Sequence, residues 1–279
     1  MKLSKRRALL LAFCITALCS LLVVVPLLMH HKPDLLTEED LQNAIANAID
    51  FIEDTREPYA LLWLDVMHRR FGITEFANSL QHYDQMLTEQ PEQLSLLRVF
   101  RRIADHNNTI KAEDLQAVSI PSDIIIAHAL YCDRLELPSD YPKMLDIEAS
   151  QGGYNLTHVL LAWIWVQENG CELALPDGFI EDMYHANAAI INSDHRNVDD
   201  LKLEAAAFLY LAGQGDLVDD SFVERVIASQ NGDGSWGHSS NDEEAEYLHW
   251  HSTILGLLLL LHVEFPADSY PPVLDSAST

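Results

Sequence analysis

Strongly apolar helical segments return along this chain at a spacing of about 47 residues. The clearest are Thr157–Val166, Leu203–Leu211 and Ser252–His262, and Tyr59–Met67 is a similar segment further upstream. The first two are each followed by a glycine-containing turn and a second, more mixed helical segment. Such units predict stacked helical hairpins, which either coil open as a solenoid or close into an α/α toroid. An irregular helical bundle with accidental similarity between its parts is the alternative.

No sustained period-two alternation of apolar and polar residues, as strands require, interrupts these segments. We therefore expect an all-α fold in which helical hairpin repeats form an incomplete α/α toroid over residues 59–265, preceded by one transmembrane helix. Residues 30–58 are expected to form a linker and an approach helix that begins after Thr37. Residues 266–279 are expected to be a C-terminal tail.

The N-terminal region predicts a membrane anchor. Residues 1–7 read MKLSKRR, and residues 8–29 contain no charged side chain, which is long enough to cross a bilayer as a helix. The basic flank should stay in the cytoplasm and place the rest of the chain in the periplasm, outside the cell or in a lumen. A cleaved signal peptide is an alternative, but its apolar region is usually shorter and ends at a cleavage site that is not evident here. A lipoprotein attachment at Cys19 is disfavoured by the bulky Leu18. We expect an uncleaved, single-pass signal anchor.

Charge excludes one class of partner. The chain has 17 Lys and Arg against 43 Asp and Glu, a formal net charge of −26. So acidic a chain repels phosphate backbones, so that nucleic-acid binding is not expected. Oligomeric state and cofactor cannot be assigned from the sequence.

The four cysteines divide between two regions. Cys14 and Cys19 lie within the expected anchor, where they behave as small apolar residues. Cys132 and Cys171 lie in the part expected to be exported, where an oxidising compartment permits a disulfide. Two buried free thiols are the other possibility, and the sequence does not decide between them.

The segment Gln230–Trp236 reads Q-N-G-D-G-S-W and fits the pattern Q-x-x-x-G-x-W. It resembles the QW motif of squalene and hopene cyclases and the glycine-rich turns of protein prenyltransferase β subunits. His251–Leu257 is similar to the start of a prenyltransferase inner helix, and Gln151–Tyr154 followed by Thr157–Leu160 resembles a shortened copy of both. The resemblance implies the toroid scaffold, with the apolar helices as the inner ring and the mixed helices as the outer one.

The turn itself has a physical interpretation. Gly232 and Gly234 are expected to adopt positive φ in a tight turn between an outer and an inner helix. The Gln230 side chain is expected to bond the free N–H groups of the next helix, and Trp236 to stack on it and cover the joint. The reactions of these families are not implied, because the chain has no Asp-x-Asp-Asp, no aspartate-rich metal motif, no Asp-x-Cys and no Cys-Gly-Glu-Gln.

Polar residues stand at the first turn of the apolar helices. Inner helices of a toroid point the same way, so that His158, Glu204 and His251 should gather at one end, joined by His128 if its shorter helix begins at the same level. Histidines with a carboxylate can hold a divalent metal, for which His128, His158 and His251 are the candidate ligands. Alternatively His158, Glu204 and His251 act as acid–base catalysts, or the same residues only cap helices.

Tyr154, Trp236, His249 and Trp250 are candidate binding residues near this end. Two functions remain open. The first is a membrane-anchored binding or scaffold protein of the cell envelope, with a peptide, glycan or lipid-derived ligand. The second is an enzyme acting on a glycan, peptide or isoprenoid-like substrate, which is favoured if the polar helix starts meet in an open cavity.

Overall fold

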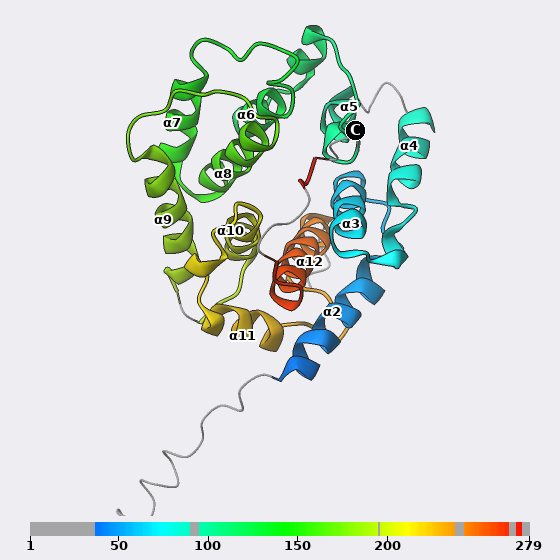
Figure 1. Ribbon diagram of the computed structural model, residues 1–279. Coiled ribbons are helices and arrows are strands. Elements are labelled where there is room, and N and C mark those ends of the chain that lie inside the picture. Colours follow the sequence, from blue (N-terminus) through cyan, green and yellow to red (C-terminus); the bar gives the residue numbers. More distant parts are fainter. Residues whose placement is uncertain (1–36, 90–94, 195, 238–242, 268–271, 275–279) are drawn as a thin grey trace, which may run out of the picture. The chain divides into compact units, whose positions relative to one another are not determined.

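The computed structural model describes residues 37–89, 95–194, 196–237, 243–267 and 272–274. All regular structure in these ranges is helical (Figure 1). The α-helices are α2 (Glu38–Ile52), α3 (Pro58–Phe71), α4 (Ser79–Glu89), α5 (Ser95–Phe100), α6 (Pro121–Leu130), α7 (Tyr141–Gln151), α8 (Gly153–Glu168), α9 (Phe179–Asn192), α10 (Asp200–Leu211), α11 (Asp220–Ala228) and α12 (Glu243–Glu264). The 3₁₀ helices are η1 (Thr74–Phe76), η2 (Arg101–Ile103), η3 (Ala112–Ala117) and η4 (Gly215–Leu217).

The most apolar helices pack against one another. Going from one neighbour to the next, α3 contacts α12, α12 contacts α10, α10 contacts α8, α8 contacts α6, and α6 contacts α5. The 3₁₀ turn η2, which follows α5 directly, contacts α3 again. A second set lies outside them, with α4 on α3, α7 on α8 and α9 on α10 (Figure 1).

The sequence explains why some helices are surrounded by others and some lie outside. Helices α8 and α10 carry buried side chains all round, as expected for helices surrounded by protein. Helices α2 and α11 are amphipathic, and each buries one stripe only. In α2 that stripe includes Ala44, Ala48 and Ile52, and one compact unit extends over Glu39–Thr279. The compact unit therefore begins before residue 59 and includes the approach helix.

The expectation of an all-helical chain is confirmed for the part of the sequence that the structure describes. The apolar segments at 59–67, 157–166, 203–211 and 252–262 lie within α3, α8, α10 and α12. The anchor expected at residues 8–29 lies outside the described residues. Among the helices that are described, none is both long and apolar enough to cross a membrane.

The turn at Gln230–Trp236 differs in detail from expectation. Gly234 has φ of 91°, but Gly232 does not have positive φ. The Gln230 amide donates to the carbonyl oxygens of Ala44 (2.8 Å) and Gly234 (2.9 Å) rather than bonding helix N–H groups. The carbonyl of Asn47 lies so close to Gly234 that a Cβ there would stand 2.1 Å from its oxygen. The turn thus fastens α2 to the segment leading into α12.

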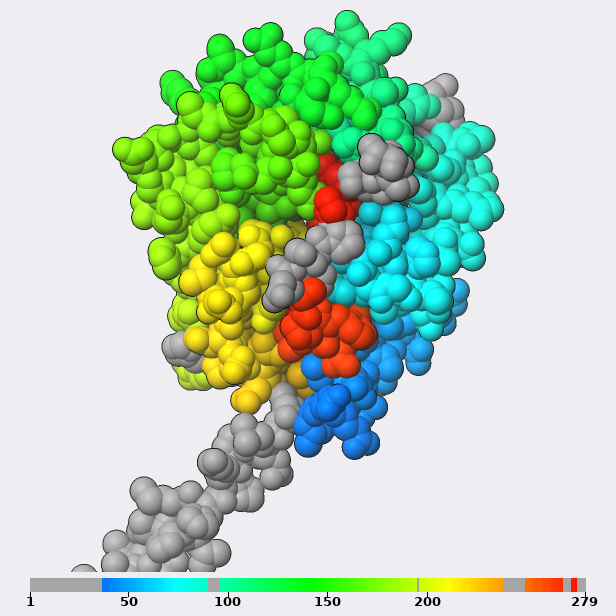
Figure 2. Space-filling model, in the orientation of Figure 1, coloured from blue at the N-terminus to red at the C-terminus, as the bar shows by residue number. Residues whose placement is uncertain are grey.

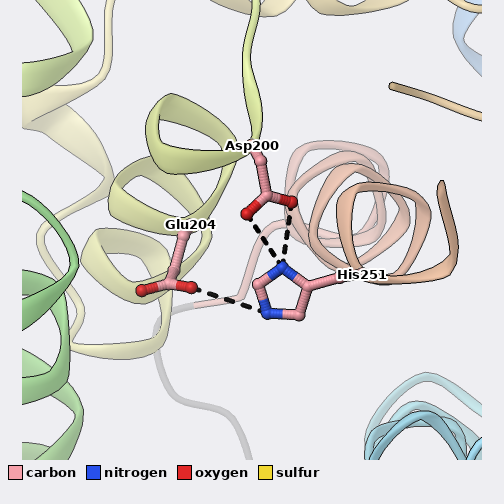
Figure 3. A group of neighbouring side chains, drawn as sticks. All are labelled: Asp200, Glu204 and His251. Atoms are coloured by element: carbon pink, nitrogen blue, oxygen red, sulfur yellow. Dashed lines mark hydrogen bonds and ion pairs between the residues drawn. The ribbon is translucent and has the colours of Figure 1, made fainter. Parts of the chain in front are cut away.

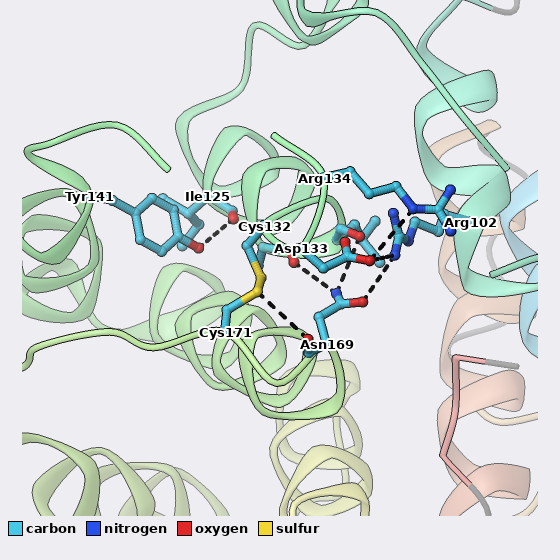
Figure 4. Close-up of a disulfide and its surroundings, with 10 residues drawn as sticks. Arg102, Ile125, Cys132, Asp133, Arg134, Tyr141, Asn169 and Cys171 are labelled. Carbon is cyan, nitrogen blue, oxygen red and sulfur yellow. Dashed lines mark hydrogen bonds and ion pairs between the residues drawn. A yellow bond between two sulfur atoms is a disulfide. The ribbon is translucent and has the colours of Figure 1, made fainter. Parts of the chain in front are cut away.

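Cys132 and Cys171 form a disulfide, which links the turn after α6 to the loop after α8 (Figure 4). Beside it lies Arg102, whose side chain is fully buried and donates to Asp133 (2.7 Å) and Asn169 (3.1 Å). Asp133 follows Cys132 directly, and Asn169 lies two residues before Cys171. The disulfide and the buried guanidinium therefore hold η2, α6 and α8 together at one point.

Candidate acid–base site in an aromatic cavity

A cavity of about 270 Å³ opens at the end of the central helices where they begin. Early residues of α3, α6, α8 and α10 line it together with residues 250 and 251 of α12, and α5 and η2 contribute further apolar side chains. The aromatic lining residues are Tyr59, Trp63, Phe100, Phe208 and Trp250. The polar lining residues are Asp123, His158, Glu204 and His251. Polar groups thus converge on an otherwise apolar space, which is the usual composition of a small-molecule site.

His251 lies between two carboxylates (Figure 3). Its Nδ1 is 2.9 Å from both carboxylate oxygens of Asp200, and its Nε2 is 3.6 Å from Oε2 of Glu204. A proton on Nδ1 is donated to Asp200, so the imidazole is oriented with Nε2 toward Glu204. Because 3.6 Å exceeds hydrogen-bond distance, Nε2 and the carboxyl group of Glu204 make no direct hydrogen bond. They attract each other as an ion pair when the imidazole is protonated and Glu204 is ionised.

Glu204 connects His251 to His158. Its side chain is nearly fully buried and accepts a hydrogen bond from the Thr157 hydroxyl. The oxygen that accepts this bond, Oε1, also lies 3.5 Å from Nδ1 of His158, whereas Oε2 faces His251. Nδ1 of His158 is also 2.6 Å from the carbonyl oxygen of Tyr154, one turn earlier in α8, and donates to it when protonated. Glu204 therefore faces an imidazole on each side.

Asp200 is the most heavily hydrogen-bonded member of the group. In addition to His251, it accepts from the Tyr154 hydroxyl (2.8 Å) and from the Ser252 hydroxyl (2.6 Å). It lies one turn before Glu204 in α10, so both carboxylates project from the same face of that helix. The first turn of α10 and the neighbouring turns of α8 and α12 thereby build the site.

The pKa values of Asp200 and Glu204 are shifted in opposite directions. Burial raises the pKa of Asp200, but hydrogen bonds and charge from His251, with those from Ser252 and Tyr154, outweigh it and leave the pKa below its usual value. Burial also raises the pKa of Glu204, and the nearby imidazoles offset this only in part. Asp200 therefore stays ionised, whereas Glu204 is a weaker acid than an exposed glutamate. Opposed shifts of this kind separate the acid from the base in catalytic sites.

The pKa of His251 is also shifted. Burial lowers it, but the hydrogen bond to Asp200 and the charges of Asp200 and Glu204 together raise it above its ordinary value. Asp123, across the cavity in the first turn of α6, has its pKa raised by burial and partly lowered by His158. His251 and Glu204 are thus two titratable groups with raised pKa values, 3.6 Å apart, which suits proton transfer to and from a bound molecule.

Asp200, Glu204 and His251 also offer one potential metal-ligand atom each, all within 4.8 Å of one another. The expected metal set contained His128, and the structure places His128 elsewhere. Helix α6 begins at Pro121, so its first turn carries Asp123, whereas His128 lies in the last turn with its ring 6.3 Å from that of Tyr141. The level expected for His128 is therefore wrong, and Asp123 occupies it.

The expected binding residues separate into two groups. Trp250 lines the cavity, and Tyr154 contacts the site through Asp200. Trp236 is a core residue, because it is 1% exposed and its indole N–H donates to the carbonyl of Val226 (2.8 Å). His249 lies 3.3 Å from the Ser235 hydroxyl, on the side of the turn, and does not line the cavity.

Asp200 and Asp123 were missed by reasoning from the sequence. The signal for Asp200 was its spacing of four residues from Glu204, which places the two on one helix face. Asp123 follows Pro121, and a proline followed by an acid marks a helix start. Both residues are acids in the first turn of a helix, where an acid stabilises the helix dipole without any further function. Their position alone therefore did not mark them as site residues.

Comparison of the chain with protein-family models, with curated proteins and with solved structures finds no match.

Proposed function

We propose that the chain is an acid–base enzyme that acts on a small, largely apolar molecule bound in the cavity. The observation that carries the proposal is the position of His251, with ionised Asp200 on Nδ1 and buried Glu204 facing Nε2. Asp200 orients the imidazole, and His251 and Glu204 are the proton-transferring groups that face the cavity. His158, on the other oxygen of Glu204, adjusts the charge of the pair.

The substrate class follows from the lining. Five aromatic side chains and several aliphatic ones surround the polar cluster, and the volume is at the lower end for ligand cavities. This composition favours a lipid-derived or isoprenoid-like molecule with one reacting polar group over a glycan, which needs many hydrogen-bond partners. A binding protein that holds such a molecule without transforming it is the alternative.

We also propose that the helices form an incomplete α/α toroid. The series of neighbours from α3 through α12, α10, α8 and α6 to α5 and η2, which contacts α3 again, supports it. The opening of one cavity among the first turns of these helices supports a shared direction for the inner helices. The QW-like turn lies where such a scaffold places it, before an inner helix.

A membrane-anchored, exported protein remains our proposal for localisation. The disulfide between Cys132 and Cys171 supports an oxidising compartment. Carbonate washing of membranes tests the anchor, because an anchored chain stays in the pellet and a cleaved or peripheral one is released.

A chromogenic proton-abstraction probe tests the enzymatic proposal. 5-Nitrobenzisoxazole is apolar and releases a coloured phenolate when a base removes its carbon-bound proton. We expect saturable turnover by the full chain, loss of turnover in His251→Ala, and retention in His128→Ala, which alters a histidine outside the cavity. Binding of the probe with equal slow conversion by all three proteins would favour a binding protein. Absence of binding would contradict the assignment of the cavity.

A further inference from the structure

A second group of charged residues, Arg69 and Glu168, lies at the C-terminal ends of α3 and α8. Residues 272–274, near the end of the chain, are described there, and Figure 2 shows this segment in red between the green and the cyan parts of the chain. Val273 is 1% and Leu274 2% exposed. Since His158 and Glu168 are separated by ten positions in α8, about 15 Å of helix lies between the cavity and this second site.

The contacts at this site are made to the main chain of the segment. The two carboxylate oxygens of Glu168 accept hydrogen bonds from the consecutive N–H groups of Val273 and Leu274, each at 2.8 Å. The guanidinium of Arg69 donates to the carbonyl oxygen of Val273 at 3.1 Å. Three successive polar groups of a backbone that bends at Val273 and Leu274 are therefore recognised by two charged side chains.

The donor in this arrangement is held in place by other contacts. Arg69 donates to the carboxylate of Asp65 (2.7 Å), one turn earlier in α3, and to the carbonyl oxygen of Ile103 (3.2 Å) in η2. These contacts involve no residue of the 272–274 segment. The guanidinium is thus preorganised, which reduces the entropy lost when a backbone carbonyl binds it.

The hydrogen-bond acceptor of this site, Glu168, receives its hydrogen bonds from residues 273 and 274. Glu168 lies in the last turn of α8, where the helix dipole disfavours an anion. Burial raises its pKa, and the N–H groups of Leu274 and Val273 and the charges of Arg70 and Arg69 lower it. Among the described residues, those two N–H groups are its hydrogen-bond donors. The two N–H groups therefore supply the hydrogen bonds of this buried carboxylate, and Arg70 and Arg69 supply positive charge.

We propose that the ends of α3 and α8 form a peptide-binding site for a polypeptide that bends at two consecutive aliphatic residues, which the chain's own Val273–Leu274 occupies in cis. Recognition through the main chain tolerates different aliphatic side chains at these two positions. Proline is excluded at both positions, because each must supply an N–H. The short connection to α12 gives the internal segment a high effective concentration, so an external peptide competes only when that segment is weakened. The site does not involve the cavity, and it does not depend on the proposed enzymatic function.

The test uses the full chain and a fluorescein-labelled peptide with the sequence of residues 268–279. Val273→Asp together with Leu274→Asp introduces charges that cannot be buried, and so should empty the site. We expect this variant to bind the peptide at least tenfold more tightly than the wild-type chain in fluorescence anisotropy. Adding Glu168→Gln should weaken binding at least tenfold, whereas adding Glu172→Gln, at an exposed position in the following loop, should not.

A second variant controls for misfolding of the first. Insertion of a long Gly/Ser segment between Ala267 and Pro272 keeps both buried residues and lowers only the effective concentration of the internal segment. It should also bind the peptide more tightly than the wild-type chain does. A peptide with proline in place of Leu274 should fail to bind either variant. Equal binding of the two peptides, or no binding by folded variants, overturns the proposal.

Discussion

The disulfide between Cys132 and Cys171 should be a major source of stability. The cysteines are 39 residues apart in sequence. Closing a loop of that length in the unfolded chain removes about 13 cal/mol/K of entropy, or about 4 kcal/mol at 25 °C. For a compact unit of this size, each kcal/mol corresponds to about 2–4 °C in melting temperature. Replacing both cysteines by serine should therefore lower the Tm by about 8–16 °C.

The assay is thermal unfolding followed by circular dichroism, with and without dithiothreitol. The reductant should lower the Tm of the wild-type chain to near that of the double-serine variant, and should leave the variant unchanged. Thiol counting on the denatured wild-type chain from an oxidising compartment should detect only Cys14 and Cys19. A Tm difference under about 2 °C between the oxidised and reduced wild-type chains would refute the loop-entropy reasoning. Four reactive thiols would refute the pairing itself.

Two further predictions concern the site and the turn. Asp200→Asn should lower the pKa of His251, measured by NMR titration, because it removes the hydrogen-bonded charge that raises it. Because the pKa of His251 is higher in the folded chain, its protonation stabilises the wild-type chain fully below the unfolded pKa of about 6.5. This stabilisation is lost as the pH rises through the folded-state pKa. The unfolding free energy of the wild-type chain should therefore fall over that pH window, and that of the variant should not. Gly234→Ala should cost about 2 kcal/mol or more in denaturant unfolding, because φ of 91° strains any other residue and the new Cβ meets Asn47. Gly232→Ala, where a Cβ meets nothing within 4 Å, should be close to neutral, and equal losses would contradict this account.

The sequence was sufficient to predict the helices and one end of the site. Long apolar runs without alternation predict buried helices, because only the interior accepts them. A charged or imidazole side chain before such a run was expected at the helix start. The structure brings His158, Glu204 and His251 together, but α12 begins at Glu243, so His251 lies in its third turn.

Other features depended on contacts that no local pattern records. The level of His128 was misjudged because the start of α6 is set by Pro121 and not by the repeat spacing. Gln230 bonds the carbonyl of Ala44, 186 residues away in sequence, and no signal near Gln230 indicates that partner. Glu168 also appears ordinary in the sequence, as the polar end of an apolar helix, until the segment at Val273 is placed beside it.

The packing of α3 against α12 has a consequence for how the protein is made. Helices from the beginning and the end of the compact unit contact each other, and Gln42 donates to Glu264 across 222 positions of sequence. A growing chain therefore exposes the apolar flanks of α3 until α12 has been synthesised, since no earlier helix takes that place. Such late closure prolongs the aggregation-prone stage of folding.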